Sequence, residues 1–319
     1  MYYPYLRAKQ FELLAVREFA SLLENDDRKI FPIIEPVKKT FSSLNKAIKI
    51  LVEKRFPFAL IINPQVGEIV GDTALIEDNV LENIKESEFF YPAYIVHAAA
   101  SYSAIQNHIA EREYRNVMLI LSNVGDIDNQ DFINLYSNNN IRVIVIEQEN
   151  RTLKRRLLNS GKSVVLLKDN FNTQKRNSDY LNQCDELFTE EHSFYKDDGY
   201  SGFSDYTTIG KDFLEGGRLP YAVAIHLTYK KNQEQVWIRH FVSDTNDDNS
   251  NIQGKFGEAA KKAVRFLDEQ NMQHRTNILS DQKLFAVQVR STVFQYQTNQ
   301  VYHFIHSGEK RNNGFRFAV

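Results

Sequence analysis

The feature that most constrains the fold of this chain is a regular alternation of short apolar runs and longer amphipathic segments. The apolar runs are rich in β-branched residues and bounded by polar ones, which is typical of buried strands in a parallel sheet. Six runs occupy positions 30–34 (IFPII), 58–62 (FALII), 93–96 (AYIV), 117–121 (VMLIL), 142–146 (RVIVI) and 163–167 (SVVLL). We predict a strand at each of them.

The segments between these runs are long enough for the crossover helices that join parallel strands. The predicted helices cover positions 41–55, 76–86, 101–112, 129–137 and 151–159. A further helix is expected before the first run, at 9–24, because its apolar residues fall on one face. The repeated strand–helix units predict an α/β fold, specifically a (β/α)8 TIM-like barrel.

The second half of the chain extends this pattern less regularly. We expect a seventh strand near 207–210 and an eighth at 221–229 (YAVAIHLTY). The run at 235–243 follows a polar turn and predicts an extra antiparallel strand after strand eight. The polar stretch 184–206 is too long for an ordinary connection and indicates a functional loop or lid. C-terminal helices are predicted at 255–270 and within 279–301.

We interpret the 319 residues as a single barrel domain. Its parts are an N-terminal helix segment (1–29), the barrel (30–272) and a C-terminal helical extension (273–319). The 39 basic and 41 acidic residues nearly cancel, so net charge does not imply nucleic-acid binding, although a local patch is not excluded. The single cysteine, Cys184, favours a reducing compartment. With no apolar membrane segment, we expect a cytoplasmic protein without a membrane partner.

Polar residues directly after the apolar runs are the first candidates for chemistry. In parallel barrels the functional groups lie at the carboxyl ends of the strands. These positions hold Glu35, Asn63, Gln65, His97, Ser122, Asn123, Glu147 and Asp169. Any one of them also fits an ordinary strand end that meets solvent. Glu35 departs most from that explanation, because a carboxylate follows a buried run directly and Pro36 fixes the exit of the chain.

A second group of candidates lies on the two late strands. His226 is inside an apolar run, where a histidine is more often a hydrogen-bonded core residue than a catalyst. If the two strands pair, however, His226, His240 and Asp244 share one cluster, which favours acid–base or metal chemistry. We therefore predict Glu35, His226, His240 and Asp244 as catalytic residues, and the sequence leaves open whether a metal or cofactor takes part. The predicted substrate-binding residues are Arg7, Lys9, Gln10, Glu12, Asn63, Asp205 and Tyr206.

Two early blocks, YPYLRAKQFELLAVRE and IFPIIEPVKK, resemble the "beta protein" family of bacterial and phage genomes. Three later blocks, GFSDYTTIG, GGRLPYAVAIHLTY and IRHFVSD, are similar to a subgroup of that family. The resemblance spans nearly the whole chain and supports Arg7, Lys9, Gln10, Glu12 and Glu35 as site residues without naming a reaction. One departure is Ala8, where the family pattern has glycine, which we expect to change little chemically. The resemblance implies an accessory-genome setting and a role in anti-phage defence.

Two functions of different classes remain open. The first is a hydrolase acting on a phosphorylated or nucleotide-like substrate, in which Arg7 and Lys9 hold the anion and Glu35 transfers protons with the two histidines. In that case Glu35→Gln should abolish activity and leave folding intact. The second is a non-catalytic scaffold that recognises a phage or host component or an effector protein encoded nearby. Its sensitive positions should be surface aromatics such as Tyr200. The sequence does not predict the oligomeric state.

Overall fold

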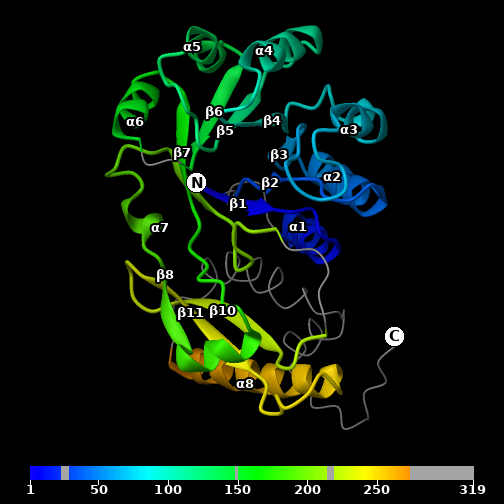
Figure 1. Cartoon of the computed structure of the whole chain (residues 1–319), viewed down its shortest axis with the longest axis vertical. Helices are drawn as coiled ribbons and strands as arrows, with labels where there is room; N and C mark the ends of the chain where they lie inside the picture. The colour runs from blue at the N-terminus through cyan, green and yellow to red at the C-terminus, as the bar shows by residue number, and fades with distance from the viewer. Residues whose placement is uncertain (23–28, 148–149, 214–218, 274–319) are drawn as a thin grey trace.

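The computed structural model describes residues 1–22, 29–147, 150–213 and 219–273. Its main body is a closed barrel of eight parallel strands in the order β1-β2-β3-β4-β5-β6-β7-β9 (Figure 1). The strands are β1 (Tyr2–Leu6), β2 (Ile33–Ile34), β3 (Phe58–Ile61), β4 (Phe90–Val96), β5 (Val117–Leu121), β6 (Ile141–Ile146), β7 (Ser163–Lys168) and β9 (Gly202–Asp205). The predicted (β/α)8 fold class is confirmed.

Helices surround this barrel. They are α1 (Gln10–Leu22), α2 (Ser42–Glu53), α3 (Thr73–Asn79) with the 3-10 turn η1 (Leu81–Asn83), α4 (Tyr102–Glu111), α5 (Gln130–Ser137) and α6 (Arg151–Leu158). Four begin at a side-chain cap, in which Asp72, Ser101, Asn129 or Asn150 accepts a hydrogen bond from the amide three residues on. Each capped helix starts soon after a strand ends, as in the predicted repeat.

The inside of the barrel is filled by side chains from alternate strand positions. These are Tyr3, Tyr5, Phe31, Ile33, Ala59, Ile61, Ala93, Ile95, Met118, Ile120, Val143, Val145, Val165 and Leu167. The barrel is therefore a packed core and not a channel. Since strand side chains alternate in direction, the next inward position on each strand lies at its carboxyl end, at the mouth of the barrel.

Three strand predictions are wrong although the total of eight is right. Tyr2–Leu6, expected within the N-terminal helix segment, is strand β1 and pairs with β2 and β9, so the barrel begins before position 30. The seventh strand expected at 207–210 is a turn that follows β9. The run 221–229, expected as strand eight, belongs to a different sheet.

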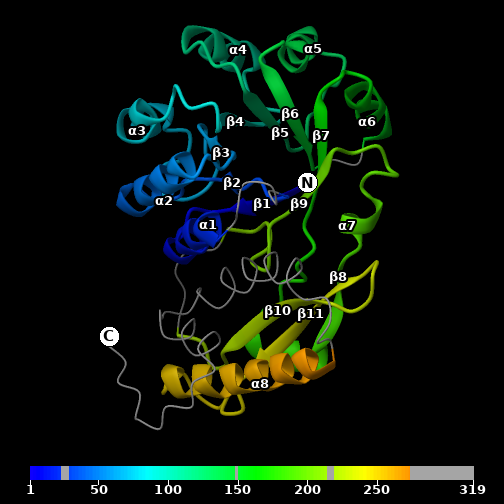
Figure 2. The ribbon, with the colours of Figure 1, turned by 180° about the vertical axis from the view of Figure 1, so that it is seen from behind.

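That second sheet has three antiparallel strands in the order β10-β11-β8, formed by β10 (Ala224–Lys230), β11 (Val236–Val242) and β8 (Asp185–Thr189). The predicted antiparallel pairing of the last two runs is confirmed. Helix α8 (Ile252–Gln273) lies along one face of this sheet, at the opposite end of the molecule from α4 and α5 (Figures 1 and 2). The cluster between them contains Val223, Ile225, Leu227, Phe241, Phe256, Ala259, Ala263 and Phe266.

The stretch 184–206 is not a lid. It contains β8, the short helix α7 (Glu191–Phe194) and the barrel strand β9, and it follows the 3-10 segment η2 (Asn177–Asn182). It therefore links the two sheets. The predicted C-terminal extension lies outside the described residues from position 274 onward.

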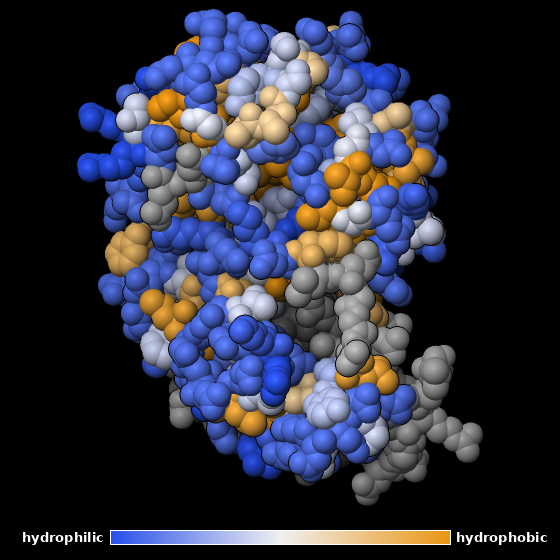
Figure 3. All heavy atoms as spheres, viewed as in Figure 1, coloured by the Kyte–Doolittle hydropathy of each residue, from blue (hydrophilic) through white to orange (hydrophobic). Residues whose placement is uncertain are grey.

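The face of the molecule shown in Figure 3 is mainly hydrophilic. On the face in Figure 3, hydrophobic side chains appear only in small separate groups. None of the described helices combines the length and the apolar character needed to cross a membrane.

Candidate functional site at the barrel mouth

Eight polar side chains occupy the inward positions at the carboxyl ends of the barrel strands, two residues past the last inward core position. One comes from each strand: Arg7, Glu35, Asn63, His97, Ser122, Glu147, Asp169 and Tyr206. Six of these residues were predicted from the sequence as polar strand ends that meet at one end of a barrel, and that placement is confirmed. They are Glu35, Asn63, His97, Ser122, Glu147 and Asp169. Arg7 and Tyr206 join them because β1 and β9 are barrel strands.

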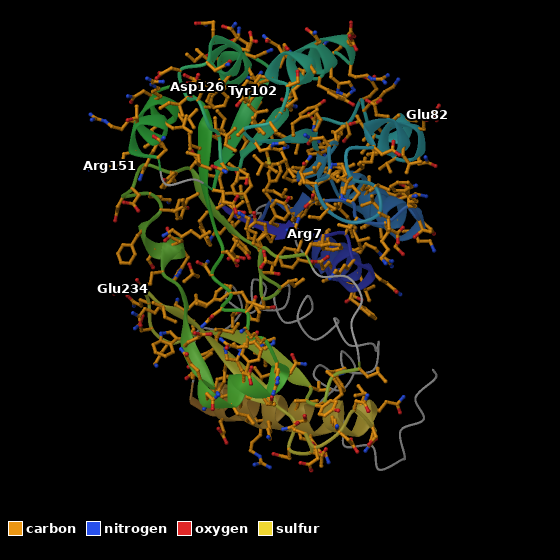
Figure 4. All side chains as sticks on the ribbon, in the orientation of Figure 1. Arg7, Glu82, Tyr102, Asp126, Arg151 and Glu234 are labelled. Carbon is orange, nitrogen blue, oxygen red and sulfur yellow. The ribbon has the colours of Figure 1, made fainter. Side chains whose placement is uncertain are left out.

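Arg7 and Glu35 form a buried ion pair at the ends of β1 and β2. Glu35 Oε2 accepts hydrogen bonds from Arg7 Nη1 and, at 2.7 Å, from the Tyr5 hydroxyl, while Oε1 accepts the Gln65 amide at 2.8 Å. Arg7 Nη2 donates to the carbonyl of Lys211 at 2.7 Å. Figure 4 shows Arg7 at the end of β1, on the side of the barrel toward the three-stranded sheet. Both charges are thus satisfied within the protein.

The aromatic surroundings keep this pair in place. The Arg7 guanidinium carbon lies 4.9 Å from the ring centroid of Tyr5 and 5.4 Å from that of Tyr206. Burial, followed by the charge of Glu35, raises the pKa of Tyr5 well above its ordinary value, so its hydroxyl remains a donor. The arrangement immobilises Glu35.

Glu12 stabilises the turn between β1 and α1. Its buried carboxylate accepts the backbone N–H groups of Arg7 at 3.1 Å and Lys9 at 2.8 Å, which caps the start of the helix. Between them Ala8 has φ of 51°, in the left-handed region that favours glycine. Alanine is less favourable than glycine in this conformation, so the residue at position 8 bears on the backbone of the turn. The exposed Gln10 only begins the helix.

Asn63 is also engaged by the fold. Its amide nitrogen donates to the carbonyl of Ile95 at 2.9 Å, and its oxygen accepts the Ile95 amide at 2.8 Å. The side chain thereby extends the pairing between β3 and β4. Its predicted role in substrate binding is untested, but in this arrangement both of its polar groups are used.

Glu147, at the end of β6, lies at the centre of a second network. Its Oε1 accepts the Tyr206 hydroxyl at 3.0 Å and contacts Lys211 Nζ at 2.7 Å, and its Oε2 accepts the Ser122 hydroxyl at 2.6 Å. Burial, and then the charge of Glu147, raise the pKa of Tyr206 above its ordinary value. The Glu147 side chain is 12% exposed, whereas that of Glu35 is fully buried. The strand-end pattern had marked it without selecting it as catalytic.

Lys211 connects three strand ends and was missed by the sequence analysis. Its carbonyl accepts from Arg7, its ammonium contacts Glu147, and its backbone N–H donates to Asp169 Oδ2 at 3.1 Å. Its side chain is 49% exposed. No sequence signal distinguishes this lysine, because it lies in the loop after β9 and outside any periodic element.

Asp205 points to the other side of β9 from Tyr206. Its Oδ1 accepts the Tyr2 hydroxyl and the Thr207 amide, each at 2.8 Å. Its Oδ2 and the Thr207 hydroxyl are buried without a partner among the described residues. Burial raises the pKa of Asp205 to about 6. Thr207 has φ of 57°, an uncommon conformation for a β-branched residue, so Asp205 holds a strained turn that leads into the Lys211 loop.

The predicted histidine pair forms, but within the three-stranded sheet. His226 and His240 are opposite each other on β10 and β11, with their Nδ1 atoms 2.6 Å apart, and His240 Nε2 lies 3.1 Å from Glu186 Oε1. Burial is the main cause of a lowered pKa at both histidines, and the neighbouring His240 lowers that of His226 further. The pair is therefore neutral near pH 7.

Asp244 is not part of this histidine cluster, contrary to the prediction. It is exposed, and its Oδ1 lies 2.6 Å from Lys262 Nζ on α8. The predicted catalytic residues thus fall in two sheets, with Glu35 in the barrel and the histidines outside it. Across the described ranges, no group of three or more His, Cys, Asp or Glu side chains is arranged to hold a metal ion.

In comparisons with known proteins, neither a family model nor a curated protein matches this chain. The resemblance to the "beta protein" family therefore stays a prediction.

Proposed function

We propose that the barrel mouth is the site of a hydrolase and that Glu147 is its acid–base group. The observation that carries this proposal is the position of the Glu147 carboxylate, which is among the inward groups at the mouth and is bonded to two hydroxyls and one ammonium, on a side chain that is 12% exposed. A general acid or base needs contact with both a substrate and a route for protons. Ser122 and Tyr206 offer such a route, and the Glu147 side chain keeps a small exposed surface.

Glu35 is better suited to positioning than to proton transfer. Three donors occupy its two oxygens, and its side chain has no exposed surface. By fixing Arg7 and the start of the β3–α3 loop, it sets the shape of the mouth beside Glu147. This revises the catalytic role that the sequence indicated.

The predicted phosphorylated or nucleotide-like substrate receives less support. Arg7 is the one cation among the eight inward residues, and Glu35 and the Lys211 carbonyl already occupy its guanidinium. A phosphate would have to compete with both of these partners. The nature of the substrate and the anti-phage setting stay predictions.

The test compares the purified protein with Glu147→Gln and Glu82→Gln on a panel of esters, amides, glycosides and phosphoesters, with products detected by mass spectrometry. Glu82 is an exposed residue of η1 at the periphery of the barrel, away from Arg7 (Figure 4), and serves as the matched control. We expect product from wild type and Glu82→Gln, and a loss of about 100-fold or more in Glu147→Gln. Full activity in folded Glu147→Gln, or no product from wild type, would refute the proposal.

A recognition scaffold is the second candidate, and the neutralised Arg7–Glu35 pair favours it, because a filled mouth also suits a purely structural role. The aromatic position predicted for such a surface is wrong, since Tyr200 is buried with Lys154 Nζ 4.3 Å from its ring centroid. Exposed alternatives are Phe194 and Tyr221. Ligand or partner binding without any turnover would favour the scaffold.

A further inference from the structure

We infer that the barrel mouth binds a primary alkylammonium group, of the kind carried by a lysine residue, and that Lys211 occupies this place in the free protein. The inference deepens the proposed function and rests on the mouth being the ligand site. It names a class of ligand and not a reaction, so it can be tested separately.

The first support is the geometry around the Lys211 ammonium. Nζ lies 2.7 Å from Glu147 Oε1, and the hydroxyls of Tyr206 and Ser122 fix that carboxylate at 3.0 Å and 2.6 Å. A carboxylate held by neighbouring hydroxyls is a ready acceptor for an ammonium, which carries three donors. The site is therefore preorganised for this group.

The backbone of Lys211 is recognised as well. Its N–H donates to Asp169 Oδ2 at 3.1 Å, and its carbonyl accepts from Arg7 Nη2 at 2.7 Å. Three strand ends thus contact the amide, the carbonyl and the ammonium of one lysine. These two backbone contacts stay with residue 211 when its side chain is displaced, so a ligand competes only for the ammonium position beside Glu147.

The charge balance at the mouth also favours a cation. Without Lys211, the arginine and the three carboxylates among the eight inward residues (Glu35, Glu147 and Asp169) leave an excess of two negative charges. The charge of Arg7 is already balanced by Glu35, so the excess comes from Glu147 and Asp169. Such a mouth attracts cations and repels phosphate.

Lys211 can be displaced at low cost. Its side chain is 49% exposed, and ion pairs of this kind contribute at most about 1 kcal/mol. An incoming ammonium would replace the Lys211–Glu147 pair by an equivalent one. The chain before it turns at Gly210, whose φ of 81° suits glycine.

The experiment is calorimetric titration of Nα-acetyl-lysine N-methylamide at pH 7 and low salt into wild type, Lys211→Ala, Lys211→Ala/Glu147→Gln and Glu82→Gln. Because Lys211→Ala removes the internal competitor, we expect it to bind the probe up to about fivefold more tightly than wild type. Adding Glu147→Gln should reverse that gain, and Glu82→Gln should match wild type. Circular dichroism confirms that each variant is folded.

Two outcomes would overturn the inference: Lys211→Ala binds the lysine probe no more tightly than wild type, or it binds inorganic phosphate in preference to the probe. n-Butylamine carries the ammonium alone and should bind about as tightly as the lysine probe, because residue 211 keeps its own backbone contacts with Asp169 and Arg7. Amine binding without turnover of any substrate would leave the inference standing and remove the hydrolase. Glu147-dependent turnover of a substrate without amine binding would overturn the inference and leave the hydrolase proposal standing.

Discussion

Replacing Glu35 by glutamine should destabilise the fold, in contrast to the expectation from the sequence. The carboxylate is fully buried and accepts from Arg7, Tyr5 and the Gln65 amide. In glutamine, one oxygen becomes an NH2 group. Whichever way the amide turns, this group meets a buried donor, and the Arg7 guanidinium loses its counter-charge.

Removing one partner of a buried ion pair typically costs about 3–5 kcal/mol. Arg7 and Glu35 have side-chain exposures of 8% and 0%, so solvent offers little compensation. We therefore expect Glu35→Gln to lower the free energy of unfolding by about 3 kcal/mol or more. Arg7→Met should cost a similar amount, and the double variant Arg7→Met/Glu35→Leu less than the sum of the two.

The assay is urea denaturation followed by far-UV circular dichroism, since the single tryptophan, Trp237, lies in the three-stranded sheet and does not report on the barrel. Glu82→Gln is the control and should change the free energy by no more than about 0.5 kcal/mol. A Glu35→Gln protein as stable as this control would refute the reasoning that the pair organises the mouth.

Three further substitutions test other parts of the structure. Ala8→Gly should raise the free energy of unfolding by about 0.5–1 kcal/mol in urea titrations, because it relieves the left-handed conformation at φ 51°; a loss of stability would contradict this. Gly67→Ala should cost more than about 2 kcal/mol by the same assay, since a Cβ would lie 2.3 Å from the Val37 carbonyl oxygen at φ 88°; near wild-type stability would show a looser loop. For Asp205, burial raises the pKa from 3.8 to about 6, so the folded protein binds this proton more tightly than the unfolded chain. The Asp205 contribution to stability should therefore fall by up to roughly 3 kcal/mol as the pH rises from about 4 to 6, and a pH-independent stability difference between wild type and Asp205→Asn would disprove it.

The sequence predicts the six central strands well because their hydrophobic runs are continuous. It fails at β1, where Pro4 lies inside a central strand, a position that proline seldom occupies. It also fails at β9, because the four residues GFSD carry no apolar run. Strand β10 looks like a barrel strand because the predicted run contains the apolar residues AVAI and the first five residues of the strand are buried, a pattern that either sheet can give.

The sequence predicts which residues reach the barrel mouth only where a residue directly follows a recognisable strand. The alternation of inward positions brings Glu35, His97 and Glu147 to one mouth, which sequence reasoning anticipates. It cannot show that Glu35 is neutralised by Arg7, because that contact depends on β1 being a barrel strand. Lys211 lies in an aperiodic loop, and its three contacts exist only in the folded chain.

The most direct test of the account sets the mouth against the histidine pair. The measurement is the turnover of the first substrate found in the product panel, compared between folded Glu147→Gln and folded His240→Gln. If the barrel mouth is the site, turnover is lost in Glu147→Gln and retained in His240→Gln. Retention in Glu147→Gln with loss in His240→Gln would place the chemistry in the three-stranded sheet and contradict the account.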